Sequence, residues 1–515
     1  MKRVYFNEFN LPMNGTVYLP LVSGMLRAYA ETFPVLKESF EFMPFLFIRD
    51  LPEKIVEKYV NPSVAAFSVC IWNHQLSLKV ARMVKKKFPS CQIVFGGPQV
   101  EANDKEKYPF IDHIILEEGE KKWVKLLGSF IGQDIACEHH GIDDFPSPYH
   151  KNLYNYVFTE YPDYTFQAIV ETNRGCPFTC DFCYWGQGFS EKKVRHHSLT
   201  YVREEAEWIG RNRIKYVFMA DANFGMYERD LQVAQIYADV HEEMYYPQKV
   251  RVCYGKNKEE NVFKTAKLMS DSGIAKAVTL ARQSNDADVL KNIRRANIKL
   301  GVYTSLQERY HNAGIPTYTE IILGLPGETV ESFKKGVSEI MGSATQLFIY
   351  HCSILPNTEM AKEDYIRRHG IKTVRVPLAE IHCSVRKPED VVEYEDIVIQ
   401  TATMTKEEWI EMCVFSWEMQ LKQTFDTDCT PMERNRFYQI AENITNGYSR
   451  GQVDARFGGI YWEPEEMAYL RIKLQEGAIT GDLEAFARDV VLFGRKSRVH
   501  QPPLGVAELT NMNQE

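Results

Sequence analysis

Short apolar runs that alternate with amphipathic segments constrain the fold of the first 140 residues more than any other feature. Runs typical of buried strands cover residues 64–70, 92–95 and 111–116. After the first run, Leu76 and Val80 lie at helical spacing on one face of a predicted helix. An order of strand, helix, strand, helix is typical of a parallel sheet with helices on both faces. We therefore predict a doubly wound parallel sheet for this part of the chain.

A second series of strand candidates follows, again separated by amphipathic helices. Six such units fit within about 190 residues. A complete barrel of this kind has eight units, so we expect a partial (β/α)6 barrel. The predicted strands cover residues 167–171, 215–220, 250–254, 277–280, 317–323 and 345–352.

The length of 515 residues exceeds the size at which a single hydrophobic core stops growing, so we expect several domains. The sheet domain covers residues 1–140. Residues 141–165 are rich in tyrosine and proline without periodicity, and we interpret them as a linker that wraps one domain onto the next. The barrel domain covers residues 166–365. The more polar residues 366–515 predict a mostly helical C-terminal domain that closes the barrel mouth and selects the substrate.

Composition argues against two classes of partner. The net charge of -8 at pH 7 disfavours a general nucleic-acid binder, because a phosphate backbone requires a basic surface. The charge-free run 9–26 is broken by Pro12, Gly15 and Pro20, and neither a membrane span nor a signal peptide is expected there. The 11 cysteines are an odd number and mostly isolated, unlike a secreted disulfide scaffold. We predict a cytoplasmic protein with no nucleic-acid or membrane partner.

Loops after the predicted strands of the first domain carry candidate ligand-binding residues. Open parallel sheets bind ligands at the carboxyl ends of their strands. Glycines there let the backbone approach a bulky ligand, although tight turns use glycine for structural reasons about as often. The candidates are Trp72, Asn73, Gly96, Gly97, Pro98, Glu118, Gly119 and Glu120.

Three closely spaced cysteines, Cys176, Cys180 and Cys183, follow the first predicted barrel strand. One interpretation is a zinc site completed by a distant ligand, but structural zinc sites usually combine two separated cysteine pairs. A [4Fe-4S] cluster is normally held by four cysteines. Three would leave one iron open to a substrate or cofactor. Phe182 would place an aromatic ring beside such a cluster.

The stretch containing Cys176, Cys180, Phe182 and Cys183 resembles the signature of radical S-adenosylmethionine (SAM) enzymes. In that family the open iron is chelated by the amino and carboxylate groups of SAM. Reduction then cleaves the sulfonium and gives a 5'-deoxyadenosyl radical. The family core is a partial six-strand barrel, which agrees with the strand count above. The resemblance implies a cluster on the three cysteines, bound SAM, and an external electron donor such as flavodoxin or ferredoxin.

Further segments resemble the SAM-binding parts of this family. MADANFG (219–225) resembles the segment that binds the methionine part, but it lacks the usual Gly-Gly-Glu, so Asp221 and Asn223 would serve instead. Segments 282–297 and 320–329 resemble those that contact ribose, carboxylate and adenine. The SAM-binding residues so implied are Phe182, Asp221, Asn223, Gln283, Ser284, Glu320 and Gly324. No catalytic acid or base is assigned.

The first domain resembles the cobalamin-binding module of class B members, on the stretches at 18–31, 67–73, 94–98 and 114–120. This implies that the strand-end candidates above contact cobalamin. The chain departs from many cobalamin proteins in lacking Asp-x-His-x-x-Gly, the motif whose histidine ligates cobalt from below. We therefore expect no histidine of this domain to ligate the lower face of cobalt.

Three functions remain open from the sequence. In a methyltransferase, cobalamin accepts a methyl group from one SAM, a second SAM yields the radical, and the substrate radical collects the methyl group. The methylated centre would be unactivated, in a small molecule or a peptide. The second function is radical rearrangement, oxidation or another group transfer without cobalamin. The third is a non-enzymatic cobalamin or redox sensor, which the SAM-binding segments argue against.

Overall fold

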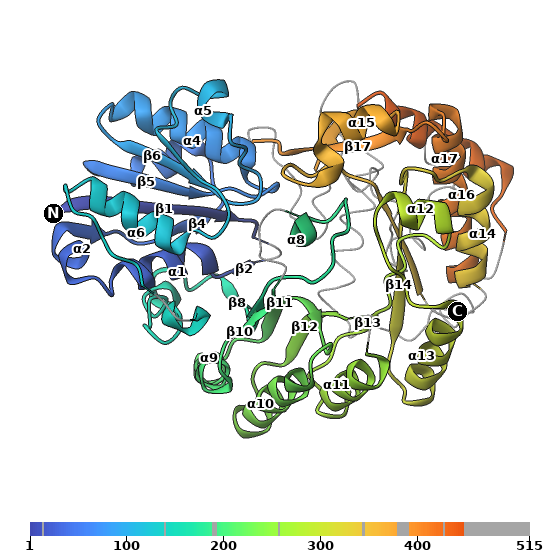
Figure 1. Ribbon diagram of the computed structural model, residues 1–515, viewed down its shortest axis with the longest axis horizontal. Helices are drawn as coiled ribbons and strands as arrows, with labels where there is room; N and C mark the ends of the chain where they lie inside the picture. The colour runs from blue at the N-terminus through green and yellow to red at the C-terminus, as the bar shows by residue number, and fades with distance from the viewer. Residues whose placement is uncertain are drawn as a thin grey trace, which may run out of the picture.

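The structure is a computed structural model that describes residues 1–12, 15–138, 141–187, 193–255, 258–341, 346–378, 391–425 and 428–447. Its first part is a six-stranded parallel sheet in the order β3-β1-β5-β6-β7, with β4 beside β1 (Figure 1). The strands are β1 (Lys2–Asn10), β3 (Phe40–Phe42), β4 (Leu46–Ile48), β5 (Pro62–Ser68), β6 (Gln92–Gly96) and β7 (His113–Ile115). The three predicted strands are present as β5, β6 and β7, whereas the sequence patterns did not identify β1, β3 or β4.

Helices cover both faces of this sheet, as expected for a doubly wound fold. Successive side chains of a strand point to opposite faces. Phe6 of β1 packs with the helices of one face, among them α6 and its buried Trp123. Tyr5 packs with those of the other face, where Leu76 of α4 is buried. The helices are α1 (Leu21–Ala30), α2 (Pro34–Ser39), α3 (Pro52–Glu57), α4 (His74–Lys87), α5 (Asp104–Lys107) and α6 (Glu120–Ser129).

The second part is the expected partial barrel. Its strands form two parallel sheets, in the orders β12-β11-β8-β2 and β13-β14-β15. All six predicted strands are present, and β2, from the N-terminal region, extends the barrel beside β8. The strands are β2 (Thr16–Tyr18), β8 (Thr165–Val170), β11 (Tyr216–Phe224), β12 (Lys249–Tyr254), β13 (Val278–Thr279), β14 (Thr317–Leu323) and β15 (Gln346–His351).

Helices form an arc on the outside of this barrel (Figure 1). They are α9 (Leu199–Arg211), α10 (Glu228–Met244), α11 (Glu259–Asp271), α12 (Ala287–Asn292), α13 (Leu300–Asn312) and α14 (Val330–Met341). A short antiparallel pair, β9 (Asn173–Arg174) and β10 (Arg195–His196), lies between β8 and α9 in the chain, and it flanks the cysteine loop and α8 (Tyr184–Gln187).

The segment interpreted as a linker packs against both parts of the chain and contributes to the core. It contains a 3-10 turn at Ile142–Asp144 and α7 (Val157–Glu160). Tyr149 and Tyr154 are fully buried in the same cluster as residues of the N-terminal sheet and of the barrel. The Tyr154 hydroxyl donates to the Pro20 carbonyl at 2.9 Å. The two domains therefore share one continuous core.

The C-terminal region is described up to residue 447, so part of the predicted domain 366–515 lies outside the described residues. It contains a 3-10 turn (Glu359–Ala361), α15 (Glu363–Arg368), β16 (Lys372–Pro377), β17 (Tyr394–Gln400), α16 (Lys406–Phe425) and α17 (Pro431–Thr445). The buried Trp409 and Trp417 of α16 pack with α14, β14 and β15. Helix α16 thus covers the outside of the last two barrel strands. No described helix is long and apolar enough to span a bilayer.

Candidate active site

A cavity of about 370 Å³ lies where the carboxyl edge of the N-terminal sheet meets the barrel. Such a volume is within the range of cofactor and small-molecule sites. Parallel strands place their carboxyl ends at one edge, and this brings loops distant in sequence together. The lining contains all eight predicted residues of the first domain: Trp72, Asn73, Gly96, Gly97, Pro98, Glu118, Gly119 and Glu120.

Two of these eight residues have clear structural reasons for their identity. Gly97 has φ +110, and a Cβ atom there would lie 2.5 Å from the backbone oxygen of Val69. Asn73 accepts from the Cys70 amide at 2.8 Å and donates to the Ser68 carbonyl at 3.1 Å. Both residues shape the cavity rim through the backbone. Gly97 has no side chain, and the side-chain amide of Asn73 is held by the backbone of Ser68 and Cys70.

The cavity also contains residues that the sequence analysis missed. Glu8 lies inside β1, and its carboxylate accepts from the Ser23 amide at 2.7 Å. Burial raises the pKa of Glu8 to about 7. Because Glu8 belongs to a strand that was not predicted, only the unusual carboxyl group in an apolar stretch could have indicated it. Further lining residues from the barrel side are Glu171, Arg174, Gly175, Tyr184, Trp185, Ala220 and Ala222.

The three cysteines lie on one loop between β9 and α8. Cys176 and Cys180 are buried, and Cys183 is partly buried. The Asn223 amide donates to the Cys176 sulfur at 3.4 Å, and the Arg295 guanidinium donates to the Cys180 sulfur at 3.8 Å. Such donors stabilise thiolates, the form that binds iron. The described residues contain no group of three His, Cys, Asp or Glu side chains placed to share one metal ion. In an iron–sulfur cluster, each thiolate instead binds a different iron.

Contacts from the second half of the barrel fix this loop. The Asp181 amide donates to the Ile293 carbonyl at 3.0 Å, and the Asp181 carboxylate is paired with Arg294. The Met360 amide donates to the Asp181 carbonyl at 3.1 Å. Phe182 packs against a small apolar cluster that includes Leu325. The predicted aromatic neighbour of the cysteines is therefore an anchoring side chain of the loop.

Asp221 and Asn223, predicted together as SAM ligands, have different surroundings. Asp221 is fully buried, and its carboxylate accepts from the Thr172 and Asn173 amides at 2.8 and 3.2 Å and from the Thr172 hydroxyl. Burial raises its pKa to about 7 despite these hydrogen bonds. These hydrogen bonds give Asp221 a role in holding the backbone of Thr172 and Asn173, and its action on SAM stays a prediction. Asn223 lies beside the first cysteine.

The other predicted SAM residues join β13 to β14. The Gln283 amide donates to the Glu320 carbonyl at 2.9 Å, and the Gln283 carbonyl accepts from the Ile322 amide at 2.9 Å. The Ser284 hydroxyl donates to the Glu328 carboxylate at 2.8 Å. Gly324 follows β14 directly. Gln283 thus pairs with the middle of β14, where Glu320 lies, and Gly324 follows the carboxyl end of the strand. None of the seven predicted SAM residues lines the cavity.

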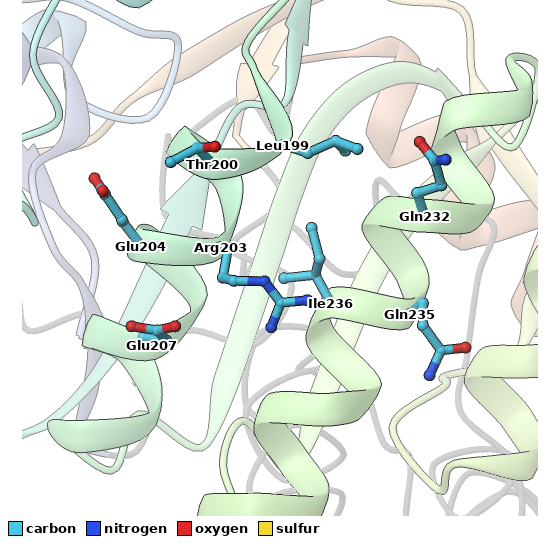
Figure 2. A pocket seen from close by; sticks show the side chains of 8 residues that line it. All are labelled: Leu199, Thr200, Arg203, Glu204, Glu207, Gln232, Gln235 and Ile236. Carbon is cyan, nitrogen blue, oxygen red and sulfur yellow. The ribbon is translucent and has the colours of Figure 1, made fainter.

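A second hollow is an open groove of about 600 Å³ between α9 and α10, on the outside of the barrel (Figure 2). Its polar lining is largely exposed, and Arg203 pairs there with Asp239 at 3.3 Å. None of the predicted site residues belongs to it, and we assign it no function.

The chain is similar to a known family of enzymes and to named relatives. A family model for the Radical SAM superfamily matches residues 170–339. The chain is 32% identical over 498 residues to the cobalamin-dependent radical SAM methyltransferase TokK of Streptomyces tokunonensis, which covers 89% of this chain and 71% of TokK. It is also 32% identical over 534 residues to the 2-(S-pantetheinyl)-carbapenam-3-carboxylate methyltransferase of Streptantibioticus cattleyicolor. That alignment covers 96% of this chain and 77% of the relative.

The fold is similar to a solved methyltransferase. The structure of TsrM from Kitasatospora setae with cobalamin and a [4Fe-4S] cluster bound aligns with a TM-score of 0.57 at 13% identity, covering 86% of this chain and 100% of TsrM. A second TsrM structure, with tryptophan and a SAM analogue, has a TM-score of 0.58. Together with the two relatives, this confirms the first of the three functions left open by the sequence. The chain therefore belongs to the class B, cobalamin-dependent radical SAM methyltransferases, which use a [4Fe-4S] cluster, SAM and cobalamin.

Proposed function

We propose that the cavity is the cobalamin site and that Cys176, Cys180 and Cys183 hold the cluster beside it. Two observations support the cavity assignment. The cavity lies at the carboxyl edge of the doubly wound sheet, where such folds bind ligands. It also reaches the barrel strand β11 through Ala220 and Ala222. Among the described residues that line the cavity there is no histidine, which supports the prediction that no histidine ligates the lower face of cobalt.

For SAM, we propose that Asn223 and the residues at the end of β14 contact the cofactor. Asn223 lies beside Cys176, the first cluster ligand in the chain. Gly324 follows the carboxyl end of β14, where such barrels bind ligands, and Gln283 and Glu320 lie beside each other in the second half of the barrel. Asp221 acts through the backbone of Thr172 and Asn173 instead.

The chemistry divides between the cofactors and the chain. When bound, the cluster and SAM supply the 5'-deoxyadenosyl radical, and cobalamin supplies the methyl group. The chain orients these groups and excludes water from the radical. Ala220 and Ala222 have small side chains, so they leave room at the wall that the cavity shares with the barrel. We place the substrate at this wall, between the cobalamin site and the cluster loop.

The substrate we propose is a small carboxylate of the carbapenam type, with a thioether side chain. One relative is named for 2-(S-pantetheinyl)-carbapenam-3-carboxylate, and this chain aligns with it over 96% of its length. The site of methylation is an unactivated carbon. The sequence left a peptide open as the alternative substrate. Neither of the two relatives described above is named for a peptide.

We also propose a small electron-transfer protein such as flavodoxin or ferredoxin as the reductant, and a cytoplasmic location. A cluster that must be reduced for each turnover needs a one-electron donor. None of the ten described cysteines is part of a disulfide, which suits a reducing compartment.

The test is an anaerobic reaction of the reconstituted enzyme with SAM, a reductant and the pantetheinyl carbapenam. We expect a product heavier by one methylene unit, together with S-adenosylhomocysteine and 5'-deoxyadenosine. The variant with alanine at Cys176, Cys180 and Cys183 should form none of the three. Formation of 5'-deoxyadenosine with methyl transfer to a peptide, and not to the carbapenam, would contradict the proposed substrate class.

A further inference from the structure

Arg174 occupies a position between the two candidate cofactor sites. It lies in β9, two residues before Cys176, and its side chain is only 11% exposed. Its guanidinium pairs with Glu120 at 2.7 Å, Glu171 at 2.9 Å and Glu118 at 3.7 Å. A planar guanidinium can satisfy several carboxylates at once because its donors form a rigid fork. Arg174 is therefore the common partner of three acidic residues.

The partners of Arg174 come from both domains. Glu118 and Glu120 belong to the loop that follows β7 and begins α6, in the N-terminal domain. Glu171 follows β8 of the barrel. Burial would raise the pKa of Glu120, but the charge and hydrogen bond of Arg174 lower it, so Glu120 remains ionised. Removing one partner of such a buried ion pair strongly destabilises a protein, because the other charge is left without compensation.

The same residues form one wall of the cavity. Arg174, its three carboxylate partners and Gly175 all line it. Beyond the last cysteine, Tyr184 and Trp185 of α8 line it as well. The cluster loop thus begins and ends in the cavity wall. Ordering this loop around a cluster also orders both of its flanking segments.

We propose that Arg174 is a positioning residue that couples the two cofactors, so that a bound cluster tightens cobalamin binding and bound cobalamin stabilises the cluster. This inference rests on the proposed assignment of the cavity to cobalamin. Coupling between two sites is reciprocal and is typically a change of about 5-fold to 150-fold in affinity. The connection between the two sites is short, because Arg174 contacts Glu118 and Glu120 in the loop on the cobalamin side and lies two residues before the cluster ligand Cys176.

The experiment measures hydroxocobalamin binding by equilibrium dialysis, with cluster-free and cluster-loaded full-length protein. For the native chain we expect the dissociation constant to fall at least about fivefold when the cluster is present. In Arg174→Met this ratio should approach one, and Arg174→Lys should restore it only in part, because an ammonium lacks the guanidinium fork.

The matched control is Arg49→Met. Arg49 is also a largely buried arginine near the cavity, which pairs with Glu393 at 3.0 Å and donates to the Trp72 carbonyl at 2.8 Å. It joins the C-terminal region to the N-terminal domain without contact to the cluster loop. Its replacement can weaken cobalamin binding, but the ratio between cluster-loaded and cluster-free protein should remain.

Two results would overturn the coupling. One is a ratio near one in the native chain, and the other is an unchanged ratio in Arg174→Met. If Arg174→Met does not fold, Glu120→Gln removes the negative charge of the nearest partner of Arg174, which belongs to the N-terminal domain. This variant should bring the ratio of the two dissociation constants closer to one in the same way. Cobalamin uptake without coupling refutes only this inference, whereas no uptake in either form of the native protein refutes the cavity assignment as well.

Discussion

At the scale of single residues, Asp221 and Asn223 of one short motif take separate tasks. Asp221 holds the backbone just before the cluster loop, through the amides of Thr172 and Asn173. Asn223 donates to the sulfur of Cys176. Their spacing of two along β11 does not reveal this difference, because the partners of Asp221 come from a segment almost fifty residues earlier. Sequence resemblance located the motif but carries no information about these different hydrogen-bond partners.

This difference predicts different losses in two variants. Asp221→Ala leaves the buried Thr172 and Asn173 amides without an acceptor, so the iron content of the reconstituted protein should fall. Asn223→Ala should retain about one cluster per chain but bind SAM more weakly. Iron analysis and equilibrium dialysis with SAM measure the two effects. Equal iron content in both variants would contradict the positioning role of Asp221.

Glu205 predicts a pH dependence of stability away from the cofactors. It is 3% exposed, and burial raises its pKa to about 8 although it accepts from the Ser147 hydroxyl. Because its pKa is raised in the folded state, its contribution is fully present below the unfolded pKa of about 4.5 and is lost as pH rises through about 8. The Glu205→Gln variant lacks this titration.

The expected result is that the native chain loses about 1–3 kcal/mol of stability relative to Glu205→Gln between pH 5.5 and 8.5. Urea unfolding of both proteins at the two pH values measures this difference. A difference that stays constant with pH would show that Glu205 is ionised in the folded protein throughout this range.

At the scale of helices and strands, the periodic patterns predicted what depends on local sequence. The strands β5, β6, β11 and β14 lie within a few residues of their predicted positions, because each is an apolar run between turn residues. The polar Asn7 and Glu8 interrupt the pattern of β1, and both are buried only because of partners elsewhere in the fold. Local patterns carry no information about such partners.

The buried tyrosines of residues 141–165 were missed for a related reason. A tyrosine-rich, aperiodic stretch is typical of a surface loop, yet Tyr154 fills a hollow in α1 that Gly24 leaves open. An added Cβ atom at Gly24 would lie 2.0 Å from the Tyr154 hydroxyl oxygen. The fit between the two residues depends on tertiary packing, which spacing along the chain does not encode.

This packing predicts opposite effects of alanine at two helical glycines. Gly24→Ala should destabilise the protein by about 1–3 kcal/mol, because Tyr154 is fully buried and cannot move aside easily. Gly301→Ala in α13 meets no atom within 4 Å and should stabilise it by up to about 1 kcal/mol through helix propensity. Urea unfolding of the two variants measures both. A neutral Gly24→Ala would contradict the close packing of the linker.

At the scale of the whole molecule, several contacts among the described residues hold the N-terminal domain around the cavity, and three of them join it to distant segments. Arg174 supplies the first. The Asn357 amide supplies the second, donating to the Pro98 and Val100 carbonyls at 3.2 and 2.8 Å. Glu393 supplies the third, accepting from the first turn of α4. The eight cavity residues were predictable because strand ends share one edge. These contacts were not, because each joins segments far apart in the chain.

The central claim is that cobalamin occupies this cavity without a histidine below the cobalt. Electron paramagnetic resonance of reconstituted protein in the cob(II)alamin state tests it most directly. The predicted spectrum shows bound cobalamin without nitrogen hyperfine splitting from a lower ligand, since the described part of the chain places no histidine in the cavity lining. A clear nitrogen splitting that disappears when His74 or His113 is replaced, or a protein that takes up no cobalamin, would contradict the account.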